Sequence, residues 1–551
     1  MKTGLIKRII AISVAGMMSV SLLLTGCGSK EKTPSTPTPT SSAAATPEPR
    51  KTISVAIYDR GNIPAAEGTV DNNRWTKWVN ENAPVNVKFV PIPRQTPKDK
   101  YNVLFASREA PDLCLEYDKS ILDQFLGNKQ LMPLDDVVNK YSKEYKQLTE
   151  KYGVFKKFTN SDGKMYYVMK ASAASINHTF LIRNDWLKNV KLNMPTNTDE
   201  LYNVVKAFTE QDPDGNGKSD TLGLSFTGYT SSVLDYFFGN VGWRAKDGKF
   251  SYAFDELKAV TEFKKKIYDA GYTDKDYPTD TNGAKAQQDF INGKIGIFGF
   301  GNGSSLLALM DSVLKNNPKA EVTVIPSIQT QFGKFAPAQT GGAQVAGAIN
   351  AACKNPDAVM KYLDWLNTES VYLNLMYGGD AYSKKTETGA YVPLDAAKFK
   401  NEVSYNSDIY MATSGVISKA NDYKLSLDQK VPAQKMTYDI TVAAENAYLK
   451  SKITDPKIGN SPLPALSSDM NLIITNTVGS SPGGITGSKL LDTMTKVVIS
   501  GKNYTVDQAM ADVKKAYDAG NGKVVEEFYD KYYQENKNKM PNAADFFQFL
   551  N

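Results

Sequence analysis

Histidine is nearly absent from this chain, which has one, His178, in 551 residues. A single imidazole leaves little room for histidine-based acid–base catalysis or for a zinc site. His178 begins an apolar segment, "HTFLIR", without an obvious catalytic partner, so we expect it to be structural. Metal and catalytic chemistry centred on histidine is therefore not expected.

Cysteine is scarce as well, with three residues at positions 27, 114 and 353 and no metal-ligand spacing among them. Cys114 and Cys353 each lie beside apolar residues. We expect both to be buried free thiols. A disulfide between them stays open, because the sequence does not place their Cα atoms within bonding reach.

Long blocks of one charge are missing too. Lys and Arg number 65 against 59 Asp and Glu, for a net charge of +6. Without the three cations of the first eight residues, the remainder carries about +3. No basic cluster, P-loop or dinucleotide fingerprint occurs, so we expect no nucleic-acid partner. A chain that is 41% hydrophobic and 23% charged is typical of a globular protein.

The N-terminus reads as a targeting segment. Residues 9–24, "IIAISVAGMMSVSLLL", are apolar or small and follow Lys2, Lys7 and Arg8. This is the pattern of a signal peptide, and the run is short for a membrane span of ~20 residues. "LTGC", ending at Cys27, resembles the bacterial lipobox, which implies cleavage before Cys27 and acylation of its thiol with palmitate-type chains. An uncleaved anchor helix is the alternative.

We therefore predict a signal peptide at 1–26 and, at 27–50, a lipidated Cys27 with a Pro/Thr/Ser-rich disordered tether. Two or more acyl chains suffice for stable anchoring. This places the body of the protein on the extracellular face of the cell membrane.

The body alternates between strand and helix patterns. Strands are predicted at 51–59, 85–93 and 112–118, with helices at 71–84 and 98–113 between them. The pattern recurs from 178 to 366, and helices dominate from about 400. Strand–helix–strand order predicts an α/β fold with largely parallel sheets.

Several stretches, in their order along the chain, carry a family resemblance. They are "APDLCLEYD" (110–118), "GKMYYVMK" (163–170), "LIRNDWLKNVKLNMPTNTDELYNVVKAF" (181–208), "FINGKIGIFGFGN" (290–302), "INAACKNPDAVMKYLDWLNTES" (349–370) and "VVEEFYDKYYQENK" (524–537). The chain resembles the type II extracellular solute-binding proteins (family 1-like) of ABC importers, in their large Gram-positive lipoprotein branch.

The resemblance implies a hinged, two-lobed periplasmic-binding-protein-like type II fold with a ligand cleft between the lobes. We expect lobe 1 to comprise 51–170 and 340–395, and lobe 2 to comprise 171–339 and the helical 396–551. Crossings are expected near 168–178, 333–343 and 380–400.

The resemblance also implies a monomeric receptor, not an enzyme, that captures a sugar or oligosaccharide and delivers it to ABC permease subunits. A receptor for peptides or other polar nutrients remains an alternative, as do a surface glycoside hydrolase and an adhesion protein. No acid pair in a recognisable motif supports the hydrolase.

Ligand-binding candidates are polar and aromatic residues just beyond strand ends, where open α/β sheets bind ligands. They are Asp59, Arg60, Asn62, Tyr117, Asp118, Trp243, Arg244, Asn302, Ser304, Tyr377, Asp380 and Tyr382. Aromatic rings stack on sugar faces, and Asp, Asn and Arg pair with hydroxyl groups, so this set favours carbohydrate. Ordinary packing is the alternative for each ring. The "MYGGDAYSKK" loop (376–385) departs from the family pattern, which leaves the ligand class open.

The loop "DPDGNGKSD" (212–220) places oxygen donors at alternate positions: Asp212, Asp214, Asn216, the carbonyl of Lys218, and Asp220. This resembles the start of an EF-hand and predicts a structural Ca²⁺ site away from the ligand. The usual glutamate position is Gly223, and some solute-binding relatives carry an acid where this chain has Thr221. A solvated Asp/Gly turn is the alternative.

Overall fold

The computed structural model describes residues 49–152, 163–172, 175–280, 282–337, 339–340, 343–450 and 488–538. The predicted signal peptide, Cys27 and all of the tether before residue 49 lie outside these ranges. Within them, no helix combines the length and apolarity needed to cross a membrane.

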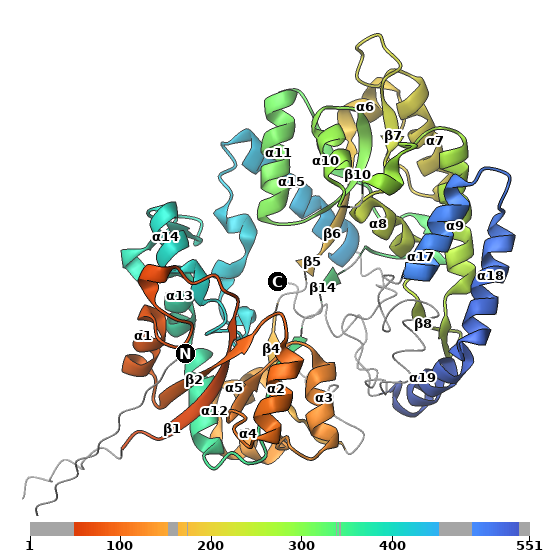
Figure 1. Cartoon of the computed structure of the whole chain (residues 1–551). Coiled ribbons are helices and arrows are strands. Elements are labelled where there is room, and N and C mark those ends of the chain that lie inside the picture. The colour runs from red at the N-terminus through yellow and green to blue at the C-terminus, as the bar shows by residue number, and fades with distance from the viewer. Residues whose placement is uncertain are drawn as a thin grey trace, which may run out of the picture. The chain divides into compact units, whose positions relative to one another are not determined.

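The first sheet has five strands in the order β2-β1-β3-β15-β4. Their bounds are β1 (Thr52–Asp59), β2 (Asn86–Pro93), β3 (Leu113–Leu115), β4 (Tyr167–Ala171) and β15 (Ala343–Ile349). β1 pairs in parallel with β2 and β3, whereas β15 runs antiparallel to β3 and β4. The carboxyl ends of β1, β2, β3 and β4 therefore meet at one edge of the sheet (Figure 1).

Helices accompany this sheet: α1 (Arg74–Asn82), α2 (Pro97–Ala106), α3 (Lys119–Gly127), α4 (Asp135–Tyr141), α5 (Glu144–Tyr152), α12 (Pro356–Leu366), α13 (Glu369–Tyr377) and α14 (Ala396–Glu402). α1 begins with a capping box, in which the Asn73 side chain accepts from the amides of Trp75 and Thr76. The apolar strand residues and one face of each helix form the first core. Figure 1 shows α2 and α3 beside one another near β4.

The second sheet has the order β11-β6-β10-β7. Its strands are β6 (His178–Arg183), β7 (Leu222–Leu224), β10 (Ile295–Gly301) and β11 (Val322–Val324). Its helices are α6 (Asn184–Asn189), α7 (Thr198–Glu210), α8 (Tyr229–Phe237), α9 (Phe254–Asp269), α10 (Ala284–Ile291), α11 (Ser304–Asn316) and α15 (Pro432–Ala444). A Cβ at Gly299 of β10 would lie 2.3 Å from the amide of Thr230, so glycine permits the close approach of α8.

A third core joins distant parts of the sequence. The hairpin β8 (Trp243–Lys246) and β9 (Lys249–Tyr252) packs with α9, α17 (Ser488–Ile499), α18 (Val506–Ala519) and α19 (Gly522–Asn536). Figure 1 shows α17, α18 and α19 in blue near α9 and β8. The long C-terminal helices are thereby fixed to residues 243–257.

Two short strands, distant in the sequence, form a separate two-stranded ribbon. β5 (Ser175–Ile176) pairs with β14 (Gln339–Thr340) in antiparallel fashion. Both strands fall within segments in which lobe crossings were predicted. The division into lobes at 170/171 and 339/340 stays a prediction that this pairing favours.

The last predicted boundary, at 396, does not agree with the packing. Val403, Tyr405, Ile409, Met411 and Ala412 lie in the first core, and residues 440–449 contribute to the second. The chain therefore stays with the first core through residue 416, because apolar side chains of 403–412 and Val416 pack against it.

Cys114 and Cys353 are both buried and free, as predicted. Burial raises the pKa of Cys353 to about 12 and raises the pKa of Cys114 further. Both thiols behave as small apolar side chains.

Candidate functional site

Charged and phenolic side chains gather at the carboxyl edge of the first sheet. Tyr58 is near the end of β1, Arg94 follows β2, Tyr117 follows β3, and Lys170 is near the end of β4. The Arg94 guanidinium lies 4.8 Å from the centre of the Tyr58 ring. The Lys170 ammonium lies 5.2 Å from the centre of the Tyr117 ring and 3.3 Å from its hydroxyl oxygen. We call Tyr58, Arg94, Glu116, Tyr117 and Lys170 the strand-end cluster.

Arg60, a predicted ligand residue, also lies at this edge. Its Nε and Nη2 donate to the two carboxylate oxygens of Asp408 at 2.6 and 2.8 Å, and the guanidinium lies 5.4 Å from the Tyr58 ring centre. The hydrogen bonds that Arg60 donates to Asp408 raise the pKa of Arg60. Arg60 and Asp408 are 348 residues apart, so the pair ties the segment after α14 to the end of β1.

Burial controls ionisation in the strand-end cluster. It raises the pKa of Tyr117 to about 12; Asp408 adds to this shift, and Arg60 and Arg94 oppose it. Burial, reinforced by the Glu116 carboxylate, raises the pKa of Tyr58 still further. Burial lowers the pKa of Lys170. Both phenols are therefore neutral hydrogen-bonding groups at physiological pH.

Three other predicted residues surround this edge. The exposed carboxylate of Asp59 accepts from the Gly61 amide at 3.0 Å, and Asn62 is exposed. The Asp118 carboxylate caps α3 by accepting from the Ser120 amide at 2.9 Å. The structure thus brings Asp59, Arg60, Asn62, Tyr117 and Asp118 to the same edge, and their role toward a ligand stays a prediction.

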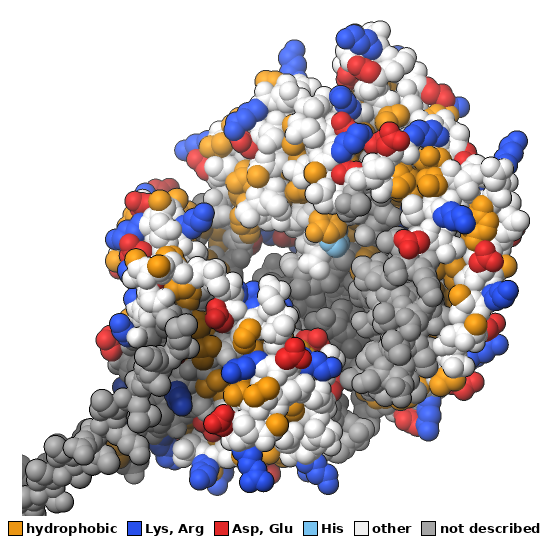
Figure 2. Space-filling model, viewed as in Figure 1, with side chains coloured by type: hydrophobic (Ala, Val, Ile, Leu, Met, Phe, Trp, Pro, Cys, Tyr) orange, Lys and Arg blue, Asp and Glu red, His pale blue; other side chains and the backbone are white. Residues whose placement is uncertain are grey.

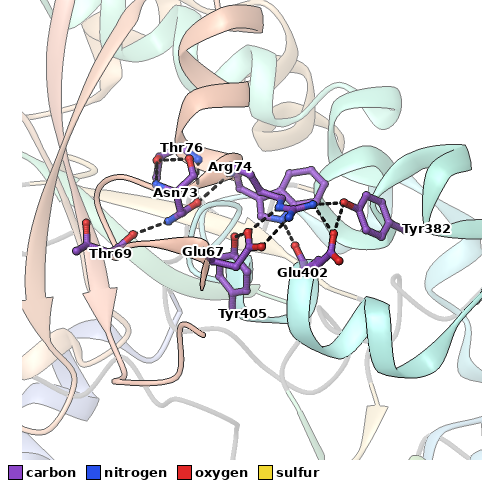
Figure 3. A network of polar contacts seen from close by, with 9 residues as sticks. Glu67, Thr69, Asn73, Arg74, Thr76, Tyr382, Glu402 and Tyr405 are labelled. Atoms are coloured by element: carbon purple, nitrogen blue, oxygen red, sulfur yellow. Dashed lines mark hydrogen bonds and ion pairs between the residues drawn. The ribbon is translucent and has the colours of Figure 1, made fainter. Parts of the chain in front are cut away.

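The predicted residues of the 376–385 loop pack against their own surroundings. The Tyr377 ring stacks on Tyr391 at 4.9 Å, and its hydroxyl donates to the Ala420 carbonyl at 3.2 Å. Asp380 is exposed. Tyr382 belongs to the ion-pair network drawn in Figure 3. Two of the three side chains therefore have clear structural contacts.

Arg74, at the start of α1, is the centre of that network. Its guanidinium binds both carboxylate oxygens of Glu67 at 2.6 Å and also binds Glu402 and the hydroxyl of Tyr382. Tyr382 donates to Glu402 at 2.8 Å, and Tyr405 donates to Glu67 at 2.8 Å. As Figure 3 shows, the network joins α1 to the region of α14.

Replacing Arg74 with methionine should lower the free energy of unfolding by about 2 kcal/mol, because Glu67 and Glu402 lose their cation. Burial alone would raise the pKa of Glu67, but the hydrogen bonds from Arg74 and Tyr405 outweigh it and leave the pKa below 4.5. A lowered carboxyl pKa stabilises the fold above the unfolded-state pKa and stops doing so as the pH falls through the folded value.

Denaturant titrations at pH 7 and at pH 3 to 4 check this. The difference between the native protein and Arg74→Met should shrink at low pH. Arg74→Lys keeps the charge but not the two-pronged geometry, and should lose an intermediate amount. A difference that does not depend on pH would contradict the account.

The remaining predicted residues lie in the second part of the chain. Trp243 is 5% exposed and packs against Phe250, Tyr252, Tyr517 and Tyr529. Arg244 lies 3.5 Å from the buried carboxylate of Glu256. These contacts favour packing, the alternative left open for each ring.

Asn302 directly follows β10 and Ser304 is the first residue of α11, so both lie just past a strand end, as predicted. The Asn302 side chain accepts from the Gly303 amide at 2.9 Å, and Ser304 is exposed. Nearby, the rings of His178 and the exposed Tyr229 are in tilted contact, with centres 4.1 Å apart and an interplanar angle of 31°. Sequence reasoning missed Tyr229, because no motif marks a ring at the first residue of a helix.

The loop 212–220 draws its acidic side chains toward Asn216. The side-chain nitrogen of Asn216 donates to the carboxylates of Asp214 at 2.8 Å and Asp220 at 3.1 Å. The Asp212 carboxylate accepts from the backbone amides of Asn216 and Gly217. Burial and the neighbouring Asp212 raise the pKa of Asp214. Thr221 turns its hydroxyl away, to the Phe208 carbonyl at 2.8 Å.

In the described part of the chain, no three acidic, histidine or cysteine side chains are grouped closely enough to hold a metal ion. The donor types of the loop still suit a hard cation: three carboxylates, one amide and free carbonyls. Binding requires the Asn216 side chain to turn its oxygen inward, in place of the nitrogen that now faces Asp214 and Asp220.

Comparison with known proteins decides the family. The family model described as bacterial extracellular solute-binding protein matches residues 68–373, more than half of the chain. The chain belongs to this family. The resemblance seen in the sequence is thereby confirmed.

Two curated relatives of this solute-binding protein come from Bacillus subtilis (strain 168). The polygalacturonan/rhamnogalacturonan-binding protein YtcQ is 30% identical over 303 residues, which cover 52% of this chain and 59% of YtcQ. Lipoprotein LipO is 26% identical over 374 residues, which cover 65% of this chain and 72% of LipO. The chain thus spans about three fifths of YtcQ.

Solved structures show the same fold at low identity. An extracellular solute-binding protein from Bifidobacterium longum subsp. infantis aligns with a TM-score of 0.63 and 19% identity, over 90% of this chain and 100% of its own. An EF-hand mutant of the S. pneumoniae ABC-transporter substrate-binding protein FusA, in complex with fructo-nystose, aligns with a TM-score of 0.58 and 16% identity, over 88% and 99%. The predicted two-lobed α/β fold is confirmed.

Four groups of this solute-binding protein's strand-end cluster were missed by sequence reasoning. Tyr58 and Glu116 stand inside the first and third predicted strands, Arg94 follows "VPIP", and Lys170 closes "YYVMK". Arg94 and Lys170 lie at the ends of the strands that finish at Pro93 and Ala171. The expectation that ligand contacts lie at strand ends therefore applies to these two residues as well.

Proposed function

We propose that this protein is the extracellular receptor of an ABC importer, which captures a sugar or oligosaccharide in an interlobe cleft and delivers it unaltered to the permease. The observation that carries the proposal is the strand-end cluster, where parallel strands of a family member present phenols, cations and a carboxylate at one sheet edge. The names of YtcQ and of the FusA complex, which specify saccharides, support this ligand class.

Acylation of Cys27 would hold the receptor at the outer face of the membrane. The lipobox-like "LTGC" and the relative named a lipoprotein support this part of the proposal. A Cys27→Ala variant should appear in the culture medium. Its full retention in the membrane fraction would contradict the anchor.

Calorimetric titration tests the proposed function. The purified protein, without its signal segment, is titrated with a panel of neutral and acidic oligosaccharides and with a panel of short peptides. One-to-one binding of a saccharide in the micromolar range or tighter is expected. Binding of peptides alone would favour the peptide receptor, and catalytic turnover of a bound glycan would favour the hydrolase.

We further propose that the loop 212–220 binds Ca²⁺ through Asp212, Asp214, Asn216, the carbonyl of Lys218, and Asp220. The ion would neutralise carboxylates whose mutual repulsion helps to raise the pKa of Asp214. Bound Ca²⁺ would fix the connection from α7 to β7, so its role would be structural.

Removing calcium with a chelator should lower the melting temperature by about 5 °C, the effect of an ion present at roughly a hundred times its dissociation constant. Differential scanning fluorimetry with and without added Ca²⁺ measures this. Asp214→Asn should abolish the shift, whereas Asp199→Asn, at an exposed position in the first turn of α7, should keep it. A melting temperature indifferent to Ca²⁺ would contradict the site.

A further inference from the structure

Two cations of the strand-end cluster have no acidic partner among the residues that the structure describes. Arg94 and Lys170 are half-buried, and neither forms a salt bridge within 4 Å in that part of the chain. The polar contact of Lys170 is the Tyr117 hydroxyl at 3.3 Å, and Arg94 lies over the Tyr58 ring at 4.8 Å. A partly buried cation is costly unless an anion or a hydrogen-bond acceptor compensates it.

Three carboxylates at the same edge are already engaged. Asp408 is bound to Arg60, and Asp59 and Asp118 accept hydrogen bonds from nearby backbone amides. One oxygen of Glu116 accepts from the Asp118 amide at 2.8 Å, and the other is buried without a hydrogen-bond partner among the described residues. The Glu116 charge acts on Tyr58. Of the residues described at this edge, only two have buried carboxylates, Asp408 and Glu116. The cations there number three: Arg60, Arg94 and Lys170.

The cations converge on one phenol. Lys170 contacts the Tyr117 hydroxyl directly, and the charges of Arg60 and Arg94 act on the same group. Tyr117 follows β3, the strand next to β1 in the sheet, whereas Lys170 reaches it from β4, which β15 separates from β3. The geometry is that of an anion site with an aromatic wall.

We propose that Arg94 and Lys170 bind an anionic group of the solute, so that the preferred ligand is an oligosaccharide bearing carboxylates, that is, one containing uronic acid units. This proposal rests on the proposed function and narrows its ligand class. A guanidinium offers parallel N–H donors that match a carboxylate, and the ammonium adds a point charge. The neutral Tyr117 hydroxyl accepts from Lys170 and donates to the Met411 carbonyl at 3.4 Å, so it holds the ammonium at this edge.

A matched pair of ligands tests this proposal. Calorimetry compares trisaccharides of galacturonate, mannuronate and glucuronate with their methyl esters, which keep the sugar skeleton but remove the charge. The variants are Lys170→Met and Arg94→Met. Lys88→Met, at an exposed position in the middle of β2, is the control, and thermal melting confirms that all variants fold.

The native protein should bind at least one acid tighter than its ester by about tenfold or more. Each site variant should weaken binding of that acid by about ten- to a hundredfold and change the ester by less than about twofold, as expected for loss of a charge-assisted hydrogen bond. The control should match the native protein.

Equal affinity for acid and ester, tighter binding of the neutral ester, or an unchanged affinity for the acid in both site variants would overturn the proposal and leave the saccharide receptor intact. Failure to bind any saccharide, charged or neutral, would overturn the proposed function itself.

Discussion

Asp185→Ala should lower the free energy of unfolding by about 4 kcal/mol, because it leaves a buried guanidinium without its anion. The Arg183 side chain is 2% exposed, and its Nε and Nη2 donate to the two oxygens of Asp185 at 2.9 and 2.5 Å. The guanidinium also lies 5.0 Å from the Trp186 ring centre. Chemical denaturation at pH 7 measures the loss.

Two controls separate this effect from others. Asp199→Ala removes an exposed acid from the first turn of α7 and should cost less than about 1 kcal/mol. The double variant Arg183→Met with Asp185→Ala should recover most of the stability, because an apolar side chain replaces the stranded charge. A double variant as unstable as the sum of its single variants would contradict this.

Gly347→Ala should lower the free energy of unfolding by about 3 kcal/mol. Gly347 lies in β15, between β3 and β4, where the register of β15 shifts. An added Cβ would lie 2.2 Å from the backbone carbonyl of Cys114 and 3.0 Å from Leu115 Cδ2. A backbone atom in the centre of a sheet moves only if the pairing of β15 with β3 opens.

The matched control is Gly127→Ala, at the last residue of α3, where an added Cβ meets no atom within 4 Å. Alanine there should be neutral or slightly stabilising. Thermal and denaturant unfolding compare the two variants. Equal midpoints for both would show that the first sheet tolerates a wider spacing than its geometry indicates.

Local patterns predicted much of the fold. The strands at 51–59 and 85–93 and the helix at 71–84 appear within a few residues, since alternation, capping residues and helical spacing are encoded locally. The two-lobed fold was predicted from the order of the family-like segments, because no local pattern indicates it.

Long-range packing explains what the sequence did not predict. Trp243 was expected at a ligand because it stands on a glycine-rich loop, but Tyr517 and Tyr529 cover it from nearly 300 residues away. Asp408 was placed in the other lobe, and Arg60 binds it across 348 residues. Lys170 and Arg94 look ordinary in sequence, and only the strand order places them beside Tyr117 and Tyr58.

The distribution of surface charge does not mark the strand-end cluster, as Figure 2 shows. Lys and Arg side chains are interspersed with Asp and Glu over the face that it draws, without a broad patch of one sign. The distinguishing feature of Arg94 and Lys170 is the combination of partial burial with the lack of an acid among the described residues. That property requires coordinates.

The central claim is that a family member holds an intact saccharide at the carboxyl edge of its first sheet. A crystal structure of the protein with the tightest-binding oligosaccharide of the calorimetric panel tests it most directly. The account predicts electron density for an uncleaved sugar in contact with Tyr117 and its neighbouring strand ends. A sugar bound elsewhere on the chain, or density for cleaved products, would contradict it.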